Sequence, residues 1–336
     1  MNCRRITCAA APLLLDGCAG SQNALGGDGA DAANFVRLFI IFIVVCTAMY
    51  ALVIAGLFGA LWRRRREPLT VETGRHDEDA PLFSRALAVW AALIVIGLAG
   101  LTLASFLADR SNAAAAKNPK LSINITGNQW WWDIEYVSND PSKSFRTANE
   151  VHLPVGVPVE VTLQSNDVIH SFWIPNLAGK QDLIPGRVTD IQLLPHKAGL
   201  YRGQCAEFCG VQHAHMALDV TVENKADFDR WVAAQQRPAF APATPLELAG
   251  YRYVTTRECS VCHNITGTPA SARVAPDLTH FASRRSIAAG TMPMSTGNLY
   301  GWVADPQSQK QGNNMPTVGL APDELHAIVA YLERLK

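Results

Sequence analysis

Two long apolar segments limit the folds open to this chain more than any other feature of its sequence. Residues 38–62 run for 25 residues without a charged side chain, and residues 86–108 for 23. A helix of either length can cross a hydrocarbon core of roughly 30 Å, whereas a buried helix of a soluble protein is usually shorter. The two segments therefore predict a transmembrane hairpin over residues 35–108, with helices at about 37–62 and 86–108.

Arginines mark the connection between these two segments. Arg63-Arg64-Arg65-Arg66 follow the first segment directly, Arg75 and Arg85 come next, and the opposite flanks carry little positive charge. Loops rich in arginine and lysine stay in the cytoplasm. The connection is therefore predicted to be cytoplasmic, and everything after residue 108 to lie outside.

Residues 1–18 are expected to be a lipoprotein-type signal. Arg4 and Arg5 precede an apolar stretch, and Leu15-Asp16-Gly17-Cys18 stands in the position of a lipobox. Asp16 departs from the small or apolar residue expected there, so a retained segment is the alternative to cleavage before Cys18.

After the hairpin the sequence consists of short β-prone runs separated by Gly, Pro and Asn. Even spacing of this kind is typical of a β-sandwich or barrel. Loops between the strands of such a frame would be held rigidly. The runs are residues 121–126, 130–137, 151–153, 158–163, 168–174, 188–194, 200–203 and 216–222.

Soft metal ligands are concentrated in one stretch, from Cys205 to Met216. Thiolate, thioether and imidazole all suit copper, and one Cys with two His and an axial Met would make a mononuclear centre. Here there is a second cysteine. If both thiolates bridge two metals, each copper has two sulfurs and one imidazole. The predicted ligands of this binuclear site are His170, Cys205, Cys209, His213, Met216 and a backbone carbonyl, most naturally that of Glu207.

Three other interpretations of this stretch are open. Cys205, Cys209, His213 and Met216 recur at near-helical spacing and could form one face of a buried helix, although Gly203 and the β-prone flanks favour a loop. A tetrahedral zinc site would fit the Cys and His ligands. A disulfide would close a tight loop and leave the histidines and the methionine without a role.

A Pro/Ala-rich stretch, residues 235–245, marks a domain boundary, and the pattern beyond it is helical. Pro322-Asp323-Glu324 opens the last helix.

Between the Pro/Ala-rich stretch and the last helix, Cys259-Ser260-Val261-Cys262-His263 has the C-x-x-C-H spacing of c-type haem attachment. In this motif two thiols hold the haem and the histidine binds its iron. A redox pair or half a zinc knuckle with a chance histidine is the alternative.

The sixth iron ligand is expected to be a methionine, which raises the reduction potential of a haem. Met315, about fifty residues after the attachment motif and just before the final helix, is the preferred candidate. Met292 and Met294 are expected to pack in the haem pocket.

This order of features resembles one family, subunit II of the haem–copper cytochrome c oxidases, in the bacterial form with a cytochrome c domain fused at its C-terminus. The similarity runs from about residue 35 to the end. It is carried by Gly127-Asn128-Gln129-Trp130-Trp131-Trp132, Asp167-Val168-Ile169-His170-Ser171, Ile184-Pro185-Gly186-Arg187, the Cys205–Met216 stretch, Ala275-Pro276-Asp277-Leu278 and residues 306–316.

The resemblance implies a multidomain fold. An all-β, cupredoxin-like Greek-key domain is expected over residues 118–232, a linker over 233–246 and an all-α class I cytochrome c domain over 247–336. These domains follow the two-helix transmembrane hairpin.

The resemblance also implies roles for individual residues. The six predicted ligands would bind the binuclear copper centre called CuA, and the carboxylate of Glu207 would reach a magnesium ion at the contact with subunit I. Trp130 matches the aromatic residue at which electrons enter, and the carbonyl of Pro276 would fix the ring of His263. Ala88 stands where many family members carry a glutamate at the mouth of a proton path.

The expected function is electron input to a respiratory oxidase of the bacterial plasma membrane. Electrons would pass from cytochrome c, or a quinol–cytochrome c reductase, through haem c and CuA to a catalytic subunit that reduces oxygen to water with proton pumping. Other oxidase subunits and membrane lipid are the expected partners, and nucleic acid is not. Electron input to a nitric oxide reductase and membrane-anchored copper delivery are the alternatives.

Overall fold

The computed structural model describes residues 20–66, 80–115 and 119–336, and the chain divides into two compact units. One unit comprises residues 34–117. The other combines the residues before 34 with residues 118–336. The predicted signal, residues 1–18, lies outside the described residues.

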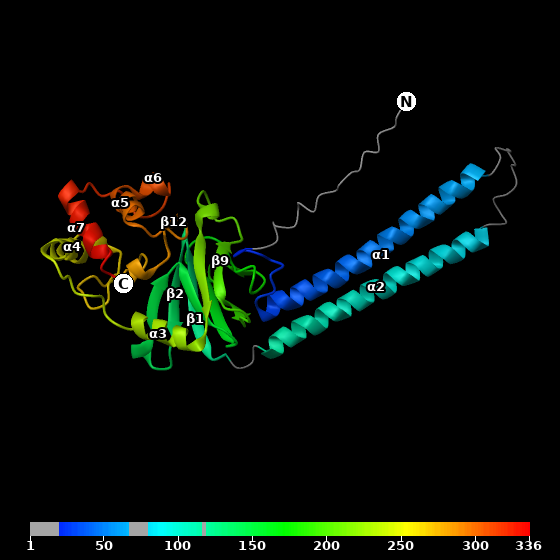
Figure 1. Ribbon diagram of the computed structural model, residues 1–336, viewed down its shortest axis with the longest axis horizontal. Helices are drawn as coiled ribbons and strands as arrows, with labels where there is room; N and C mark the ends of the chain where they lie inside the picture. Colours follow the sequence, from blue (N-terminus) through cyan, green and yellow to red (C-terminus); the bar gives the residue numbers. More distant parts are fainter. Residues whose placement is uncertain (1–19, 67–79, 116–118) are drawn as a thin grey trace, which may run out of the picture. The chain divides into compact units, whose positions relative to one another are not determined.

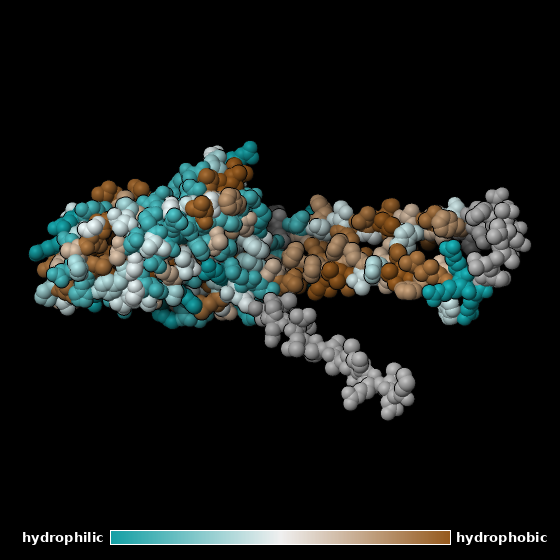
Figure 2. Space-filling view, turned by 90° about the horizontal axis from the view of Figure 1, so that it is seen from above, coloured by the Kyte–Doolittle hydropathy of each residue, from teal (hydrophilic) through white to brown (hydrophobic). Residues whose placement is uncertain are grey.

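The first unit consists of the two predicted membrane helices, α1 (Ala30–Arg66) and α2 (Ala80–Ala115). Both extend beyond the apolar runs, because flanking Arg, Leu and Ala residues are good helix formers. The spans Ala30–Arg66 and Phe83–Arg110 are long and apolar enough to cross a membrane. Hydrophobic side chains cover the surface of both helices, as Figure 2 shows. Four arginines end α1, where the helix dipole favours cations.

The second unit contains a sandwich of two five-stranded sheets (residues 121–223), which confirms the predicted all-β domain (Figure 1). One sheet has the order β3-β2-β1-β5-β8 and the other β4-β10-β9-β6-β7, with β1 parallel to β5 and β4 parallel to β10. The strands are β1 (Leu121–Asn128), β2 (Trp131–Val137), β3 (Phe145–Ala148), β4 (Glu150–Pro154), β5 (Val159–Ser165), β6 (His170–Trp173), β7 (Gln181–Leu183), β8 (Thr189–Leu193), β9 (Gly199–Cys205) and β10 (Ala217–Glu223).

Side-chain alternation along the strands forms the core between the sheets. In β1 Ile123 and Ile125 are buried, and in the neighbouring β5 Val159, Val161 and Leu163 are buried, while the residues between them are more exposed. A strand points successive side chains to opposite faces, so this pattern buries one face of each sheet. Ten β-strands in two sheets thus give a rigid frame for the loops at their ends.

Two strands, β3 and β7, were absent from the sequence prediction. Both lie at the edge of a sheet, β3 beside β2 and β7 beside β6. Each has only three or four residues and carries polar side chains. Strands this short hold at most two apolar side chains, so their sequences cannot show the alternation that reveals a longer strand.

The C-terminal region (residues 245–336) is mainly helical and has a separate hydrophobic core. Its helices are α4 (Pro245–Thr256), α5 (Thr296–Ala304), α6 (Pro306–Gln309) and α7 (Pro322–Leu332), with a short hairpin of β11 (Ser286–Ile287) and β12 (Met292–Pro293). Before it, α3 (Lys225–Gln235) follows the last strand of the sandwich.

Helices α4 and α7 cross closely at Gly250. A Cβ atom at this position would lie 1.9 Å from the carbonyl oxygen of Ala327, so only glycine allows the contact. Ile328, Val329 and Leu332 of α7 are buried, and so is Leu335 beyond its end. These are apolar positions of the helix predicted after Pro322.

Residues 20–33 pack against the sandwich. The side chain of Asn176 accepts a hydrogen bond from the amide of Asn23 at 2.8 Å and donates one to Asp28 at 3.0 Å. Gly29 forms a β-bridge with Pro195. The chain segments immediately before α1 and after α2 therefore belong to the same folded unit.

Candidate functional site

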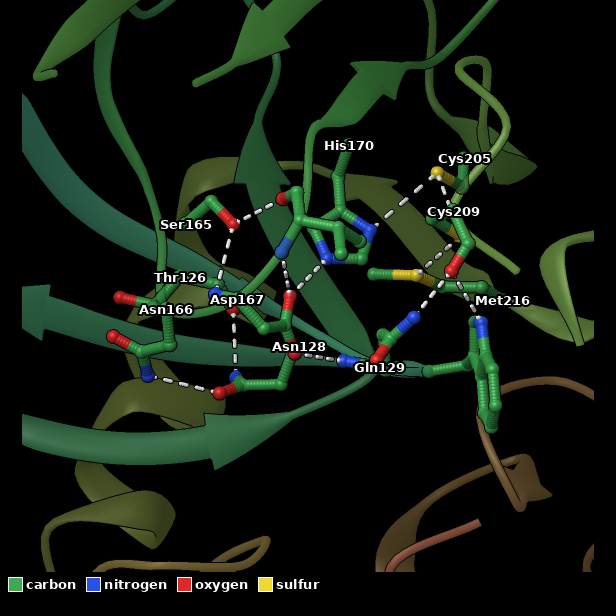
Figure 3. Close-up of polar contacts among 12 residues, drawn as sticks. Thr126, Asn128, Gln129, Ser165, Asn166, Asp167, His170, Cys205, Cys209 and Met216 are labelled. Carbon is green, nitrogen blue, oxygen red and sulfur yellow. Dashed lines mark hydrogen bonds and ion pairs between the residues drawn. The ribbon is translucent and has the colours of Figure 1, made fainter. Parts of the chain in front are cut away.

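Six potential metal donors converge at one end of the sandwich. Figure 3 labels His170, Cys205, Cys209 and Met216 among them. Sγ of Cys205 lies 3.7 Å from Sγ of Cys209 and 3.8 Å from Nδ1 of His170. Sγ of Cys209 lies 3.6 Å from Nδ1 of His213 and 3.9 Å from Sδ of Met216. The sixth donor, the carbonyl of Glu207, lies 3.2 Å from Sγ of Cys205.

The sheet β4-β10-β9-β6-β7 brings these donors together. His170 begins β6 and Cys205 ends β9, and the antiparallel pairing of these strands places Phe172 opposite Cys205. The loop returns to β10 just after Met216, whose carbonyl accepts a 2.9 Å hydrogen bond from the amide of Cys205. Within the loop only residues 213–215 form a helical turn, so the donors do not form one face of a buried helix.

Gly127 at the end of β1 allows the ring of His170 to reach this position. A Cβ atom on residue 127 would lie 2.8 Å from Cδ2 of His170, closer than carbon atoms approach each other. His170 itself is completely buried. The Gly127-Asn128-Gln129-Trp130 motif thus leaves room for the ring of His170 and also supplies side chains to the site.

A carboxylate orients the same ring. Oδ1 of Asp167 accepts a 2.8 Å hydrogen bond from Nε2 of His170, which leaves Nδ1 facing Cys205. Histidines that bind metals usually donate their other ring N–H to a carboxylate or carbonyl. In the sequence Asp167 is visible only as part of the Asp167-Val168-Ile169-His170-Ser171 motif, and its role beside His170 depends on the loop geometry.

The two thiols share a hydrogen bond and therefore differ in acidity. The hydrogen bond that the Cys209 thiol donates to Cys205, together with the nearby His170, lowers the pKa of Cys205 to about 3. The pKa of Cys209 is raised, because Cys205 holds the proton of that thiol in the same hydrogen bond. Such a pair carries one proton between its sulfurs. A metal that binds both sulfurs as thiolates releases that proton.

The donor set fits two coppers better than the alternatives. The sulfurs are 3.7 Å apart and both cysteines are free, so they are not joined as a disulfide. A structural zinc site takes four ligands, but six donors converge here. Two thiols, two imidazoles, a thioether and a carbonyl are donors that would suit a pair of coppers.

Trp130 lies against this centre. Its indole N–H donates a 2.9 Å hydrogen bond to the carbonyl of Cys209, and the Gln129 side chain donates another at 2.7 Å. The residue is 8% exposed. The aromatic ring thus contacts the backbone of a thiol donor directly.

In the C-terminal region, His263 has one ring nitrogen, Nε2, available to bind a metal. Its Nδ1 donates to the carbonyl of Pro276 at 2.7 Å, as the sequence comparison with the family had implied. Burial lowers the pKa of His263 and keeps the ring neutral. Cys259 and Cys262 are free and partly exposed, so their thiols fit thioether attachment of a haem.

The three candidate methionines differ in their surroundings. Met292 and Met294 pack against the hydrophobic core of the C-terminal region. Met315 lies in a loop held by polar contacts: its amide donates to Asn313 at 2.8 Å and its carbonyl accepts from Gln307 at 2.8 Å. This is the distribution expected if Met292 and Met294 serve in packing.

Comparison with known proteins finds relatives of both the sandwich and the C-terminal region. Residues 121–223 match the family described as cytochrome c oxidase subunit II, periplasmic domain, and residues 248–336 match cytochrome c. Cytochrome c oxidase subunit 2 of Alkalihalophilus pseudofirmus is 31% identical over 96% of this chain and 94% of its own length. The chain belongs to the cytochrome c oxidase subunit II family.

Other members of the subunit II family match shorter parts. The subunit 2 of Bacillus sp. (strain PS3) is 33% identical over 64% of this chain and 62% of its own. The solved periplasmic domain of subunit II from Bradyrhizobium japonicum is 31% identical, with a TM-score of 0.34 over 36% of this chain and 96% of that one.

Membership of the subunit II family confirms the resemblance and the multidomain fold predicted from the sequence. The chain is a membrane-anchored, electron-input subunit of an oxidoreductase, and other oxidase subunits are its partners. The subunit II match implies a CuA centre and the cytochrome c match implies haem. The cluster of His170, Cys205 and Cys209 is a possible site for the copper.

Other histidines and acids of the sandwich contact neighbouring side chains. His152 stacks on Trp231 with ring centroids 4.0 Å apart and lies 2.8 Å from Glu223. His215 contacts Gln212 at 2.7 Å. Asp133 pairs with Arg146, and burial raises its pKa. Asp133 therefore serves the sandwich itself through this ion pair.

Sequence reasoning missed two buried cations of the C-terminal region that contact the sandwich. Arg284 lies 3.6 Å from Glu150 and donates to Thr147 at 3.3 Å. Lys310 donates to the carbonyl of Trp130 at 2.8 Å. Neither belongs to a ligand pattern, so only long-range contacts reveal them.

Proposed function

We propose that this chain passes electrons from an external cytochrome or reductase through haem c and CuA to a catalytic subunit that reduces oxygen to water with proton pumping. The convergence of six donors between β6, β9 and β10 carries the proposal. Residues 118–232 would form the copper domain, 247–336 the haem domain and 233–246 the linker.

His170, Cys205, Cys209, His213, Met216 and the carbonyl of Glu207 would hold the copper. When bound, CuA supplies one-electron transfer with the charge shared over two metals. The protein keeps the donors nearly fixed, because His170 and Cys205 belong to paired strands and Asp167 holds the imidazole. A rigid site changes little between oxidation states, which favours rapid transfer.

Cys259 and Cys262 would attach the haem, with His263 and Met315 on its iron. The Pro276 carbonyl orients His263 so that its other nitrogen is free. Trp130 would accept electrons on their way to CuA. Its contact with the Cys209 carbonyl supports this role, since the ring touches the backbone of a proposed copper ligand directly.

The carboxylate of Glu207 would bind magnesium at the contact with subunit I. It is half exposed and lies 3.4 Å from the ammonium of Lys180. An exposed carboxylate next to the copper loop can take an oxygen-seeking cation, and the ion would replace Lys180 as its partner.

The copper and haem domains would face the extracytoplasmic side of a bacterial plasma membrane. Residues 20–33 and 119–336 share one folded unit, so both ends of the hairpin leave the membrane on the same side. The four arginines at the end of α1 favour the cytoplasm for the other side.

Electron paramagnetic resonance of the copper-loaded full chain tests the copper assignment. Two thiolates that bridge two metals delocalise one unpaired electron, so the oxidised protein should show coupling to two equivalent coppers. Cys209→Ser should abolish the signal. Met216→Leu should change it and retain copper, since an axial thioether is a weak ligand.

The matched control is Cys46→Ser, which changes an exposed cysteine of α1 and should leave the spectrum unchanged. A one-copper pattern, or zinc as the bound metal, would contradict the proposal.

A further inference from the structure

Lys310 belongs to the C-terminal region, at the end of α6, but its side chain contacts the sandwich. The residue is 3% exposed. Its ammonium donates to the carbonyls of Trp130 at 2.8 Å and His215 at 2.7 Å, both in the sandwich, and of Ala288 at 2.9 Å in its own region. An ammonium has three N–H donors, so all of them are used.

Burying this side chain is costly, because a charged group loses its water. Burial lowers the pKa of Lys310 to about 7. Lysine is almost never fully buried without a partner. Two of its three hydrogen-bond acceptors belong to the sandwich and one to the C-terminal region, so its burial serves the contact between the two parts.

The carbonyl of Ala288 belongs to an unusual turn. Ala288 and Ala289 have φ angles of 54° and 59°, and Gly290 follows with 75°. Left-handed backbone is unfavourable for residues that carry a Cβ atom. In this turn the carbonyl of Ala289 accepts a 3.0 Å hydrogen bond from the amide of Ala217 in β10. Contacts with the sandwich thus hold a turn that is strained by itself.

The residues after Lys310 cover Trp130. A Cβ atom on Gly312 would lie 3.7 Å from the indole ring of Trp130, in van der Waals contact. The carbonyl of Gln311 accepts a 2.8 Å hydrogen bond from the side chain of Gln212, in the copper loop. The chain continues from here to Met315, so the loop that carries the candidate iron ligand lies on Trp130.

We propose that Lys310 is a positioning residue that locks the C-terminal region onto the sandwich, with the loop leading to Met315 seated on Trp130. The inference rests on the proposed function for the roles of Trp130 and Met315. It means that the attached haem occupies the surface where electrons enter CuA. A soluble cytochrome then reaches copper only through that haem.

Lys310→Met in the full chain tests this role, because it keeps the length of the side chain and removes the ammonium. Lys225→Met is the matched control, since the Lys225 side chain is 71% exposed and pairs with Asp229 on α3. The first measurement is hydrogen exchange at the amide of Ala217 in copper-free protein. Loss of a charged, buried donor should accelerate this exchange about tenfold or more.

The second measurement is flash reduction of the haem in copper-loaded protein, followed by the absorbance of CuA. Lys310→Met should slow this transfer by a similar factor, with the haem and copper spectra unchanged. Lys310→Arg keeps the charge and should lie closer to the parental protein in both measurements. It also tests the proposal if Lys310→Met fails to fold.

If the amide of Ala217 exchanges at the same rate in both Lys310 variants as in the parental protein, the proposal is overturned. Faster hydrogen exchange at Ala217 together with an unchanged rate of electron transfer would also overturn it, because the contact made by Lys310 would then not position the haem. If the parental protein itself transfers no electrons from haem to copper, the proposed function fails, and the exchange at Ala217 still decides whether Lys310 locks the two parts together.

Discussion

Nε2 of His170 donates a 2.8 Å hydrogen bond to Oδ1 of Asp167, and the other oxygen of this carboxylate accepts a 2.7 Å bond from the amide of Gln129. One acid thus connects a proposed copper ligand to the residue before Trp130. The position of the imidazole and the position of the indole depend on the same side chain.

Asp167→Asn should weaken copper binding by about tenfold to a hundredfold, the usual effect of removing a partner of a metal-bound histidine. The amide cannot accept both bonds, so the ring of His170 loses orientation. Copper titration of the full chain, followed by absorbance, measures the change. Asp190→Asn on the exposed face of β8 is the control and should bind copper like the parental protein. Equal affinity in Asp167→Asn would show that the ring is held by packing alone.

Gly127→Ala should lower copper affinity, because the added methyl group would lie 2.8 Å from Cδ2 of His170. Overpacking of this kind costs about 1–3 kcal/mol, which the site can relieve only by moving the ring. Gly297→Ala is the matched control, since nothing lies within 4 Å of a Cβ atom there. The same titration compares the two variants, and parental binding by Gly127→Ala would mean that the strand shifts instead of the ligand.

Met315→His should lower the reduction potential of the haem by on the order of a few tenths of a volt, because imidazole replaces a thioether that favours the reduced iron. A spectroelectrochemical titration gives the potential. Met294→Leu should leave it nearly unchanged, since Met294 packs against the core. An unchanged potential in Met315→His would assign the iron ligand to another methionine.

Trp130→Phe should slow reduction of CuA by the attached haem about tenfold, the scale on which small displacements of reacting groups change rates. The variant keeps an aromatic ring but loses the 2.9 Å bond to the Cys209 carbonyl. Flash reduction of the haem measures the rate. Trp231→Phe, in contact with His152, is the control and should transfer at the parental rate. A parental rate in Trp130→Phe would place the electron path elsewhere.

Local patterns in the sequence were enough to predict the membrane helices and the inner strands, and they also led to the proposed copper loop and haem motif. Each of these is encoded over a short stretch: a charge-free run for α1, alternation for β1 and β5, ligand spacing for Cys205 to Met216. The strands β3 and β7 were missed, since four and three residues are too few to show an alternation.

Contacts between distant residues were decided only by the tertiary structure. Asp167 was visible in the sequence as an acid, but its hydrogen bonds to His170 and Gln129 depend on how two loops meet. Lys310 lies 180 residues from Trp130 in the chain and carries no motif. The donors of both proposed redox sites could be predicted from the sequence, because ligand chemistry depends on residue type. Which surfaces meet was decided by the fold, because burial and hydrogen bonding depend on the whole packed chain.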